Sequence, residues 1–231
     1  MAAMVTWLLV HSPLVGPVIW NPVAAELRQQ GQEAIIPDLT PALIGGGNHA
    51  QLQAELVAAA VRQGPVALVA HSGAGPPLPL IAHRLAQQNV AVVASLFVDA
   101  WLPHPRQSAL DVLPVPAAEQ LRGMIVEGWL PPWTSWWPAG QLRVMLPDEQ
   151  LRNLVVDTCP RLPLSLFTEV LPDMNEDELG VCSYVRLSSA YDAFADQAEQ
   201  AGWSVRRLES HHLGVFTSPA EIVDILQDVR K

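Results

Sequence analysis

The sequence predicts an α/β fold with a mostly parallel central sheet and helices on both of its faces. Short runs such as 5–10 and 66–70 are apolar without polar alternation, which is typical of strands buried on both sides. Helical stretches separate these runs and supply the crossovers that parallel strands need. The 231 residues suffice for one domain with a small insertion.

Each expected element has a local justification. The first strand, within Met1–Val10, lacks a basic leader and a cleavage site, so we do not interpret it as a signal peptide. Gly31 and Gly64 follow helical stretches as C-terminal caps, and Ser218-Pro219 starts the last helix. Strands are expected at 5–10, 32–37, 66–70, 90–98, 183–187 and 204–208, and helices at 21–30, 50–63, 77–88, 191–201 and 219–230.

The alternation stops between residues 103 and 178. This stretch holds about half of the 21 Pro, and many of the 8 Trp lie in or beside it. We expect short helices near 116–127 and 148–171 joined by Pro-rich turns. The prediction is therefore a core of residues 1–102 and 179–231 with an inserted helical cap at 103–178.

Composition excludes several functions. A net charge of −10 and the lack of a basic cluster argue against nucleic acid and against an anionic membrane surface as partners. No apolar stretch is long enough to span a bilayer. The two cysteines, Cys159 and Cys182, are expected to be reduced thiols of a cytoplasmic protein. The histidines match no metal-ligand spacing, so no metal and no cofactor is expected.

The segment AHSGA at 70–74 lies between an apolar strand and a helix. It resembles the nucleophile elbow of the alpha/beta-hydrolase superfamily, with Ala in place of the usual Gly on either side. A sharp strand-to-helix turn needs small residues two before and two after the serine. The helix start behind Ser72 would stabilise developing negative charge.

Three more segments resemble the plant methylesterase and hydroxynitrile lyase group and its bacterial relatives. They are HSPLVGPVIW at 11–20, IIPDL at 35–39 and HHLGVFTSP at 211–219. The resemblance covers nearly the whole chain except the cap and implies the alpha/beta-hydrolase fold. It also implies that Ser72 is the nucleophile and His212 the catalytic base.

Two carboxylates compete for the role of orienting His212. Asp192 lies about where most members of the group carry their acid, although some two residues further along. Asp99 ends the strand after the nucleophile helix, which resembles the placement in haloalkane dehalogenases of the same superfamily. A buried Asp at a strand end needs a partner, which favours Asp99.

The oxyanion loop departs from the group's pattern. One donor in the group is the N–H of the second residue after the loop histidine, and here that residue is Pro13, which has no N–H. The N–H of Gly73 remains, and the Ser12 hydroxyl or the Leu14 N–H are candidates for the second donor. The loss of one donor typically costs about 10²–10³ in rate.

The indoles of the cap predict a bulky apolar or aromatic acyl group. The leading function is a serine hydrolase acting on esters or thioesters. The alternatives are an acyltransferase that takes the acyl group from a carrier-protein thioester, a lyase, or a non-catalytic ligand binder. The single lysine, Lys231, argues against the lyase; the oligomeric state cannot be inferred. The candidate substrate-binding residues are Trp101, Trp129, Trp133, Trp136 and Trp137.

Overall fold

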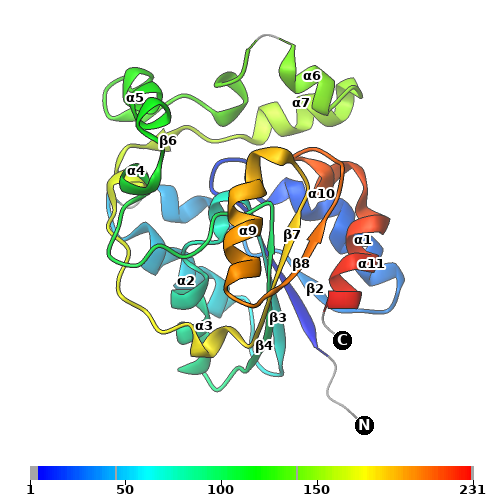
Figure 1. Cartoon of the computed structure of the whole chain (residues 1–231). Helices are drawn as coiled ribbons and strands as arrows, with labels where there is room; N and C mark the ends of the chain where they lie inside the picture. The colour runs from blue at the N-terminus through cyan, green and yellow to red at the C-terminus, as the bar shows by residue number, and fades with distance from the viewer. Residues whose placement is uncertain (1–4, 45, 139, 230–231) are drawn as a thin grey trace.

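The computed structural model describes residues 5–44, 46–138 and 140–229 (Figure 1). Its centre is a six-stranded sheet in the order β2-β1-β3-β4-β7-β8, and every neighbouring pair is parallel. The predicted fold class is confirmed. The strands are β1 (Thr6–Val10), β2 (Ala34–Ile35), β3 (Val66–His71), β4 (Val92–Val98), β7 (Val181–Arg186) and β8 (Ser204–Arg207).

The central strands are buried on both faces, as their apolar runs require. All residues of β1 and β3 are buried. Alternate side chains of β1 therefore enter two different apolar clusters, with Trp7 and Leu9 in one and Leu8 and Val10 in the other. Residues 1–4 of the expected core, Gly45 and the end of the last expected helix lie outside the described residues.

Helices cover both faces of the sheet. On one face lie α1 (Asn21–Gln29) and α11 (Pro219–Val229), and on the other lie α2 (His49–Ala59), α3 (Leu78–Ala86) and α9 (Asp192–Gln200). The connections carry short helices: η1 (Pro17–Trp20), η2 (Thr40–Leu43), η3 (Ser72–Ala74), η6 (Ser189–Tyr191) and α10 (Gly214–Thr217).

Most of the segment between β4 and β7 lies above the carboxyl ends of the strands, and its last part runs back down to η5 (Asp177–Leu179) beside α3 (Figure 1). Its strands β5 (Trp129–Leu130) and β6 (Leu162–Pro163) pair antiparallel. Cap residues Trp133 and Val155 belong to the same apolar cluster as β1, so the division into core and cap stays a prediction. The other helices are α4 (Ala109–Val112), α5 (Val115–Gly123), η4 (Trp133–Ser135), α6 (Gln141–Met145), α7 (Glu149–Thr158) and α8 (Ser165–Thr168).

One expected cap element differs from the structure. The helix expected near 148–171 ends at Thr158, and β6 and α8 follow it. Pro160 and Pro163 explain the break, because proline donates no backbone hydrogen bond and its ring clashes with the preceding turn.

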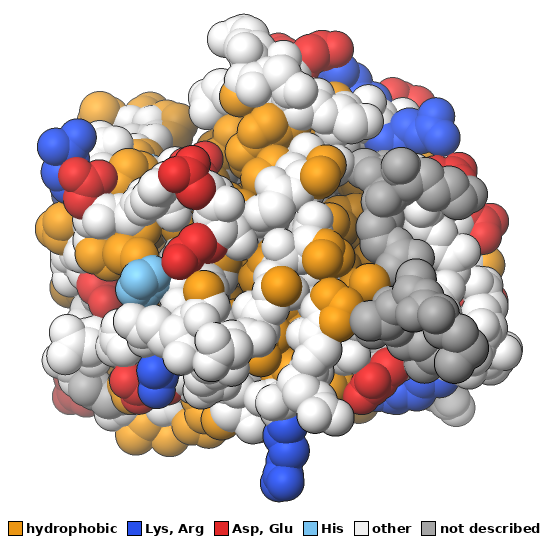
Figure 2. All heavy atoms as spheres, turned by 90° about the horizontal axis from the view of Figure 1, so that it is seen from below, with side chains coloured by type: hydrophobic (Ala, Val, Ile, Leu, Met, Phe, Trp, Pro, Cys, Tyr) orange, Lys and Arg blue, Asp and Glu red, His pale blue; other side chains and the backbone are white. Residues whose placement is uncertain are grey.

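The face opposite the cap carries acidic and basic side chains around its rim, with hydrophobic side chains between them (Figure 2). Within the described parts of the chain, no helix is both long and apolar enough to cross a membrane. The same residues contain no group of three potential metal ligands. Both cysteines are free thiols, and burial raises the pKa of each to about 11.

Candidate active site

Ser72 sits at the sharp turn between β3 and η3 with a φ of 57°, in the left-handed region. Residues other than glycine rarely adopt this conformation, and it persists only where the surroundings impose it. The small side chains of Ala70 and Ala74 are fully buried beside the turn. The backbone of Trp101 contributes to the restraint, because its N–H donates to the Ser72 carbonyl at 3.1 Å.

Asp99 follows β4 and is fully buried. Its Oδ1 accepts hydrogen bonds from the backbone N–H groups of Leu187 at 2.6 Å and Ser188 at 3.0 Å. Its Oδ2 accepts from the Ser188 hydroxyl at 2.6 Å and lies 3.0 Å from Nδ1 of His212. Burial works against the ionised carboxylate, but the bonds from His212 and Ser188 outweigh it and lower the pKa of Asp99.

The imidazole of His212 is held by stacking as well as by Asp99. The Tyr191 ring lies parallel to it, with 4.8 Å between centroids and 3° between planes. The His71 ring also stacks on it at 4.5 Å. Burial lowers the pKa of His71 to about 3, so His71 is neutral and its Nε2–H donates to the His212 carbonyl at 2.8 Å.

The structure brings Asp99 to His212 and leaves Asp192 elsewhere. Asp192 begins α9, and its carboxylate pairs with Nε of Arg186 at 2.8 Å. The Arg186 side chain is only 10% exposed, so it needs this counter-charge. Both carboxylates follow strand ends, but the two N–H groups after β7 are directed at Asp99.

Tyr191 is a site residue that the sequence reasoning missed. Its hydroxyl lies 3.5 Å from Oγ of Ser72. Burial raises the pKa of Tyr191, against opposing hydrogen bonds from Ser72 and Trp101, so the phenol stays protonated. The signal available in the sequence was its place just beyond the carboxyl end of a parallel strand, where sites of such sheets form.

The loop at 11–16 lies directly against the elbow. A Cβ added to Gly73 would come 3.2 Å from Oγ of Ser12 and 3.4 Å from Leu14. The N–H of Leu14 is already engaged, because it donates to Oγ of Ser12 at 3.2 Å. His11 fastens the loop, since its Nδ1 bonds the Ser12 carbonyl and its Nε2 accepts from the Leu39 N–H, both at 2.9 Å.

A cavity of about 1110 Å³ opens above Ser72. Its lining includes Ser72, Gly73 and His212, and no lysine or arginine is among the described residues that line it. A drug-sized ligand site typically measures about 300–1,000 Å³, so this cavity admits a large ligand.

Four of the five tryptophans expected to bind substrate line this cavity: Trp101, Trp133, Trp136 and Trp137. Trp133 also contacts the His212 ring, with 5.9 Å between centroids. The structure does not bring Trp129 to the cavity. Its side chain is 37% exposed, and the Arg161 guanidinium lies over its ring at 5.9 Å.

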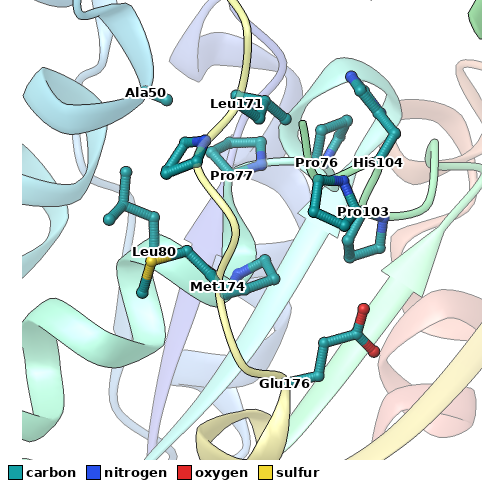
Figure 3. Close-up of a pocket in the computed structure, with 12 residues that line it drawn as sticks. Ala50, Pro76, Pro77, Leu80, Pro103, His104, Leu171, Met174 and Glu176 are labelled. Carbon is teal, nitrogen blue, oxygen red and sulfur yellow. The ribbon is translucent and has the colours of Figure 1, made fainter. Parts of the chain in front are cut away.

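A small crevice of about 20 Å³ adjoins the cavity (Figure 3). Pro76, Pro77 and Pro103 line both spaces. Figure 3 shows Leu171 and Met174 on the segment that crosses the crevice. The crevice has room for about one water molecule, so the larger cavity is the candidate ligand site.

Comparisons with known proteins give a fold but no close relative. No protein-family model matches the chain. No curated protein matches it by sequence. Solved structures do match over nearly the full length.

One similar structure is an extracellular alpha/beta-hydrolase from a Paenibacillus species, described as sharing structural and functional homology with tobacco Salicylic Acid Binding Protein 2. It has a TM-score of 0.77 and 18% identity, over 97% of this chain and 98% of that one. A mutant of tomato methylketone synthase I has a TM-score of 0.75 and 16% identity, over 98% of this chain and 97% of that one.

A pyrethroid hydrolase from Sphingobium faniae JZ-2 has a TM-score of 0.71 and 18% identity, covering 98% of this chain and 97% of that chain. These matches agree with the fold that the resemblance in the sequence implies. The chain has the alpha/beta-hydrolase fold.

Proposed function

We propose that the protein is a serine hydrolase that cleaves carboxylic esters or thioesters with a bulky hydrophobic or aromatic acyl group. The observation that carries the proposal is the 3.0 Å contact between Asp99 and His212 below a cavity that Ser72 and His212 both line. A carboxylate that fixes an imidazole beside a serine is the arrangement that makes a hydroxyl nucleophilic.

In the proposed mechanism, Asp99 holds the proton on Nδ1 of His212, which leaves Nε2 free to accept the Ser72 proton. The Ser72 hydroxyl, which lies beside Tyr191 in this structure, turns toward His212 and attacks the acyl carbon. His212 then protonates the leaving group, and water releases the acyl group from Ser72 by the same steps. Asp99 stabilises the imidazolium throughout.

The oxyanion hole is proposed to combine the N–H of Gly73 with the Ser12 hydroxyl. Leu14 donates to Oγ of Ser12, which leaves the hydroxyl proton of Ser12 free for another acceptor. The closeness of Oγ to Gly73 supports this pairing. The Ser12 hydroxyl then replaces the donor that Pro13 cannot supply.

The lining of the cavity supports an uncharged, apolar acyl group. Indoles cover large apolar groups at low entropic cost, and cationic side chains that would hold a second carboxylate or a phosphate are absent among the described lining residues. The substrate is proposed to be a small molecule or an acyl group on a carrier protein. We also propose a cytoplasmic location, with both thiols reduced.

An acyltransferase is the second candidate, favoured by the aromatic rings around His212. Trp133 and Tyr191 both contact this ring, and a dry environment would slow attack by water on the acyl-serine. An alcohol or amine acceptor would then compete with water for the acyl group.

A fluorophosphonate probe tests the proposal. We expect it to label the wild-type protein at Ser72, and we expect Ser72→Ala to abolish labelling. Absence of labelling in folded wild-type protein would refute the serine nucleophile. p-Nitrophenyl esters of increasing chain length then report hydrolysis, and added alcohols or amines separate the transferase from the hydrolase by the product formed.

A further inference from the structure

The wall of the cavity formed by α2 contains a buried polar group without a partner. The Gln53 side chain is only 3% exposed, yet it lines the cavity. Its Oε1 has no hydrogen-bond partner among the described residues. A buried amide oxygen left unpaired is costly and rare in folded proteins, so its retention calls for an explanation.

A second polar group lies one helical turn away. The carboxylate oxygens of Glu169 both lie 3.3 Å from the backbone N–H of Ala50, in the first turn of α2. Ala50 and Gln53 are three residues apart and share a face of the helix. Figure 3 shows Ala50 at the edge of α2, on the side facing Leu171. Glu169 and Gln53 therefore bring a carboxylate and an amide to the same part of a cavity whose lining is mostly, but not wholly, apolar.

We infer that this part of the cavity is a subsite for a hydroxyl group carried on the distal end of the acyl chain. The inference rests on the proposed function for the position of the acyl group. A hydroxyl group can both donate and accept a hydrogen bond. The Gln53 amide carries an NH₂ donor and a carbonyl acceptor, so it can pair with a hydroxyl in either orientation of the amide. Glu169 provides a further acceptor.

The charge of Glu169 favours a neutral hydroxyl over an ammonium group. Its carboxylate already interacts with the N-terminal end of α2, where the helix dipole stabilises negative charge. It needs no cation from the ligand. The apolar walls between this subsite and Ser72, which include Pro76 and Pro77, suit the alkyl part of the chain.

Binding of uncleavable ligands tests the subsite directly. The probes are N-methyl amides of straight-chain fatty acids of increasing length, each paired with its ω-hydroxy counterpart and measured by titration calorimetry. At the chain length that reaches Gln53 we expect the wild-type protein to bind the ω-hydroxy amide about tenfold more tightly, the typical worth of one hydrogen bond.

Gln53→Leu removes the amide at nearly constant volume, and we expect it to abolish this preference without lowering Tm, because the amide oxygen has no partner to lose. Gln197→Leu is the matched control, since Gln197 lines the same cavity but is exposed, and it should keep the preference. Equal binding of both amides by the wild type, or a preference that survives Gln53→Leu, overturns the inference.

The corresponding ω-amino amide tests whether the subsite prefers a hydroxyl group to an ammonium group. Tighter binding of the amine than of the hydroxy amide, lost in Glu169→Gln, would overturn the choice of a hydroxyl group. These measurements need no turnover, so they are independent of the fluorophosphonate result. Failure of labelling refutes the hydrolase, whereas failure of the ω-hydroxy preference refutes only the subsite.

Discussion

The backbone N–H of Ser72 donates to the carbonyl of Asp99 at 3.1 Å, and both residues have left-handed φ values, 57° and 41°. Such conformations cost of order 1–3 kcal/mol each and cluster at functional sites. The two turns thus restrain each other across neighbouring strands. The candidate nucleophile and the candidate acid are fixed relative to one another before any substrate binds.

Asp99→Asn should lower kcat/KM for a p-nitrophenyl ester by about 10³–10⁴-fold, because an amide in this place no longer fixes the imidazole tautomer. Asp192→Asn removes a counter-charge of the nearly buried Arg186 and should lower stability, but it should change kcat/KM by less than about threefold, since Asp99 and not Asp192 holds His212. Circular dichroism of both variants checks folding. A loss in the Asp192 variant as large as that in the Asp99 variant would reverse the assignment.

Ser12→Ala should reduce kcat about 10²-fold with little change in KM, because an oxyanion donor acts mainly in the transition state. Ser12→Thr retains a hydroxyl and is the matched control, expected to recover much of the activity. Steady-state kinetics on one ester measure both. Full activity in Ser12→Ala would exclude the hydroxyl as the second donor.

Tyr191→Phe should change kcat by less than about threefold, because the phenol oxygen lies 3.5 Å from Oγ of Ser72, longer than an ordinary O–H···O hydrogen bond. The ring stays stacked on His212 in this variant. Tyr191→Ala removes the stacking as well and should lower kcat. The labelling rate with the fluorophosphonate compares the variants, and a large loss in Tyr191→Phe would instead make the phenol a required donor.

Two buried histidines predict a loss of stability in acid. Burial lowers the pKa of His11 to about 4 and that of His71 to about 3, whereas an unfolded histidine titrates near 6.5. Between about pH 6 and pH 4 the two histidines bind protons in the unfolded chain but stay neutral in the folded protein. The free energy of unfolding therefore rises with pH over this range. Each histidine contributes a slope of about 1.4 kcal/mol per pH unit.

Urea unfolding of the wild type at several pH values between 4.5 and 7.5 measures this slope. His71→Asn removes one titrating group and should reduce the slope by about 1.4 kcal/mol per pH unit. An unchanged slope in this variant would mean that His71 accepts a proton in the folded protein.

The parallel sheet could be predicted because its strands are apolar on both faces, a local property of the sequence. The elbow at Ser72 could be predicted for the same reason, since its small neighbours are adjacent in the chain. The sequence favours Asp99 over Asp192, because a buried Asp needs a partner, but it does not identify that partner, since both carboxylates follow strand ends. The choice depends on the N–H groups of residues 187 and 188 and on Arg186, which only the assembled sheet brings together.

Two other contacts between distant segments escaped prediction. Tyr191 contacts Ser72, which is 119 residues away in the sequence, and Glu169 contacts Ala50 at the same separation of 119 residues. No periodicity encodes such pairs. The helix expected near 148–171 ends at Thr158 for a local reason, because Pro160 and Pro163 cannot continue it.

Gly75 offers a last test of how tightly the site is built. Its φ is −67°, so alanine fits the backbone, yet an added Cβ would lie 1.9 Å from the Trp101 carbonyl oxygen. Gly75→Ala must therefore displace the chain just after Asp99. We expect a loss of about 1–3 kcal/mol in the free energy of unfolding, typical of overpacking, together with reduced kcat.

Gly123, in α5, is the matched control, because an added Cβ there meets nothing within 4 Å. Gly123→Ala should stabilise the protein by about 0.4–1 kcal/mol through the entropy of the unfolded chain, with kcat unchanged. Urea unfolding and ester kinetics on both variants separate the two effects. If Gly75→Ala kept full activity and stability, the chain after Asp99 would be free to move, and the restraint between the Asp99 and Ser72 turns would not govern the geometry of the site.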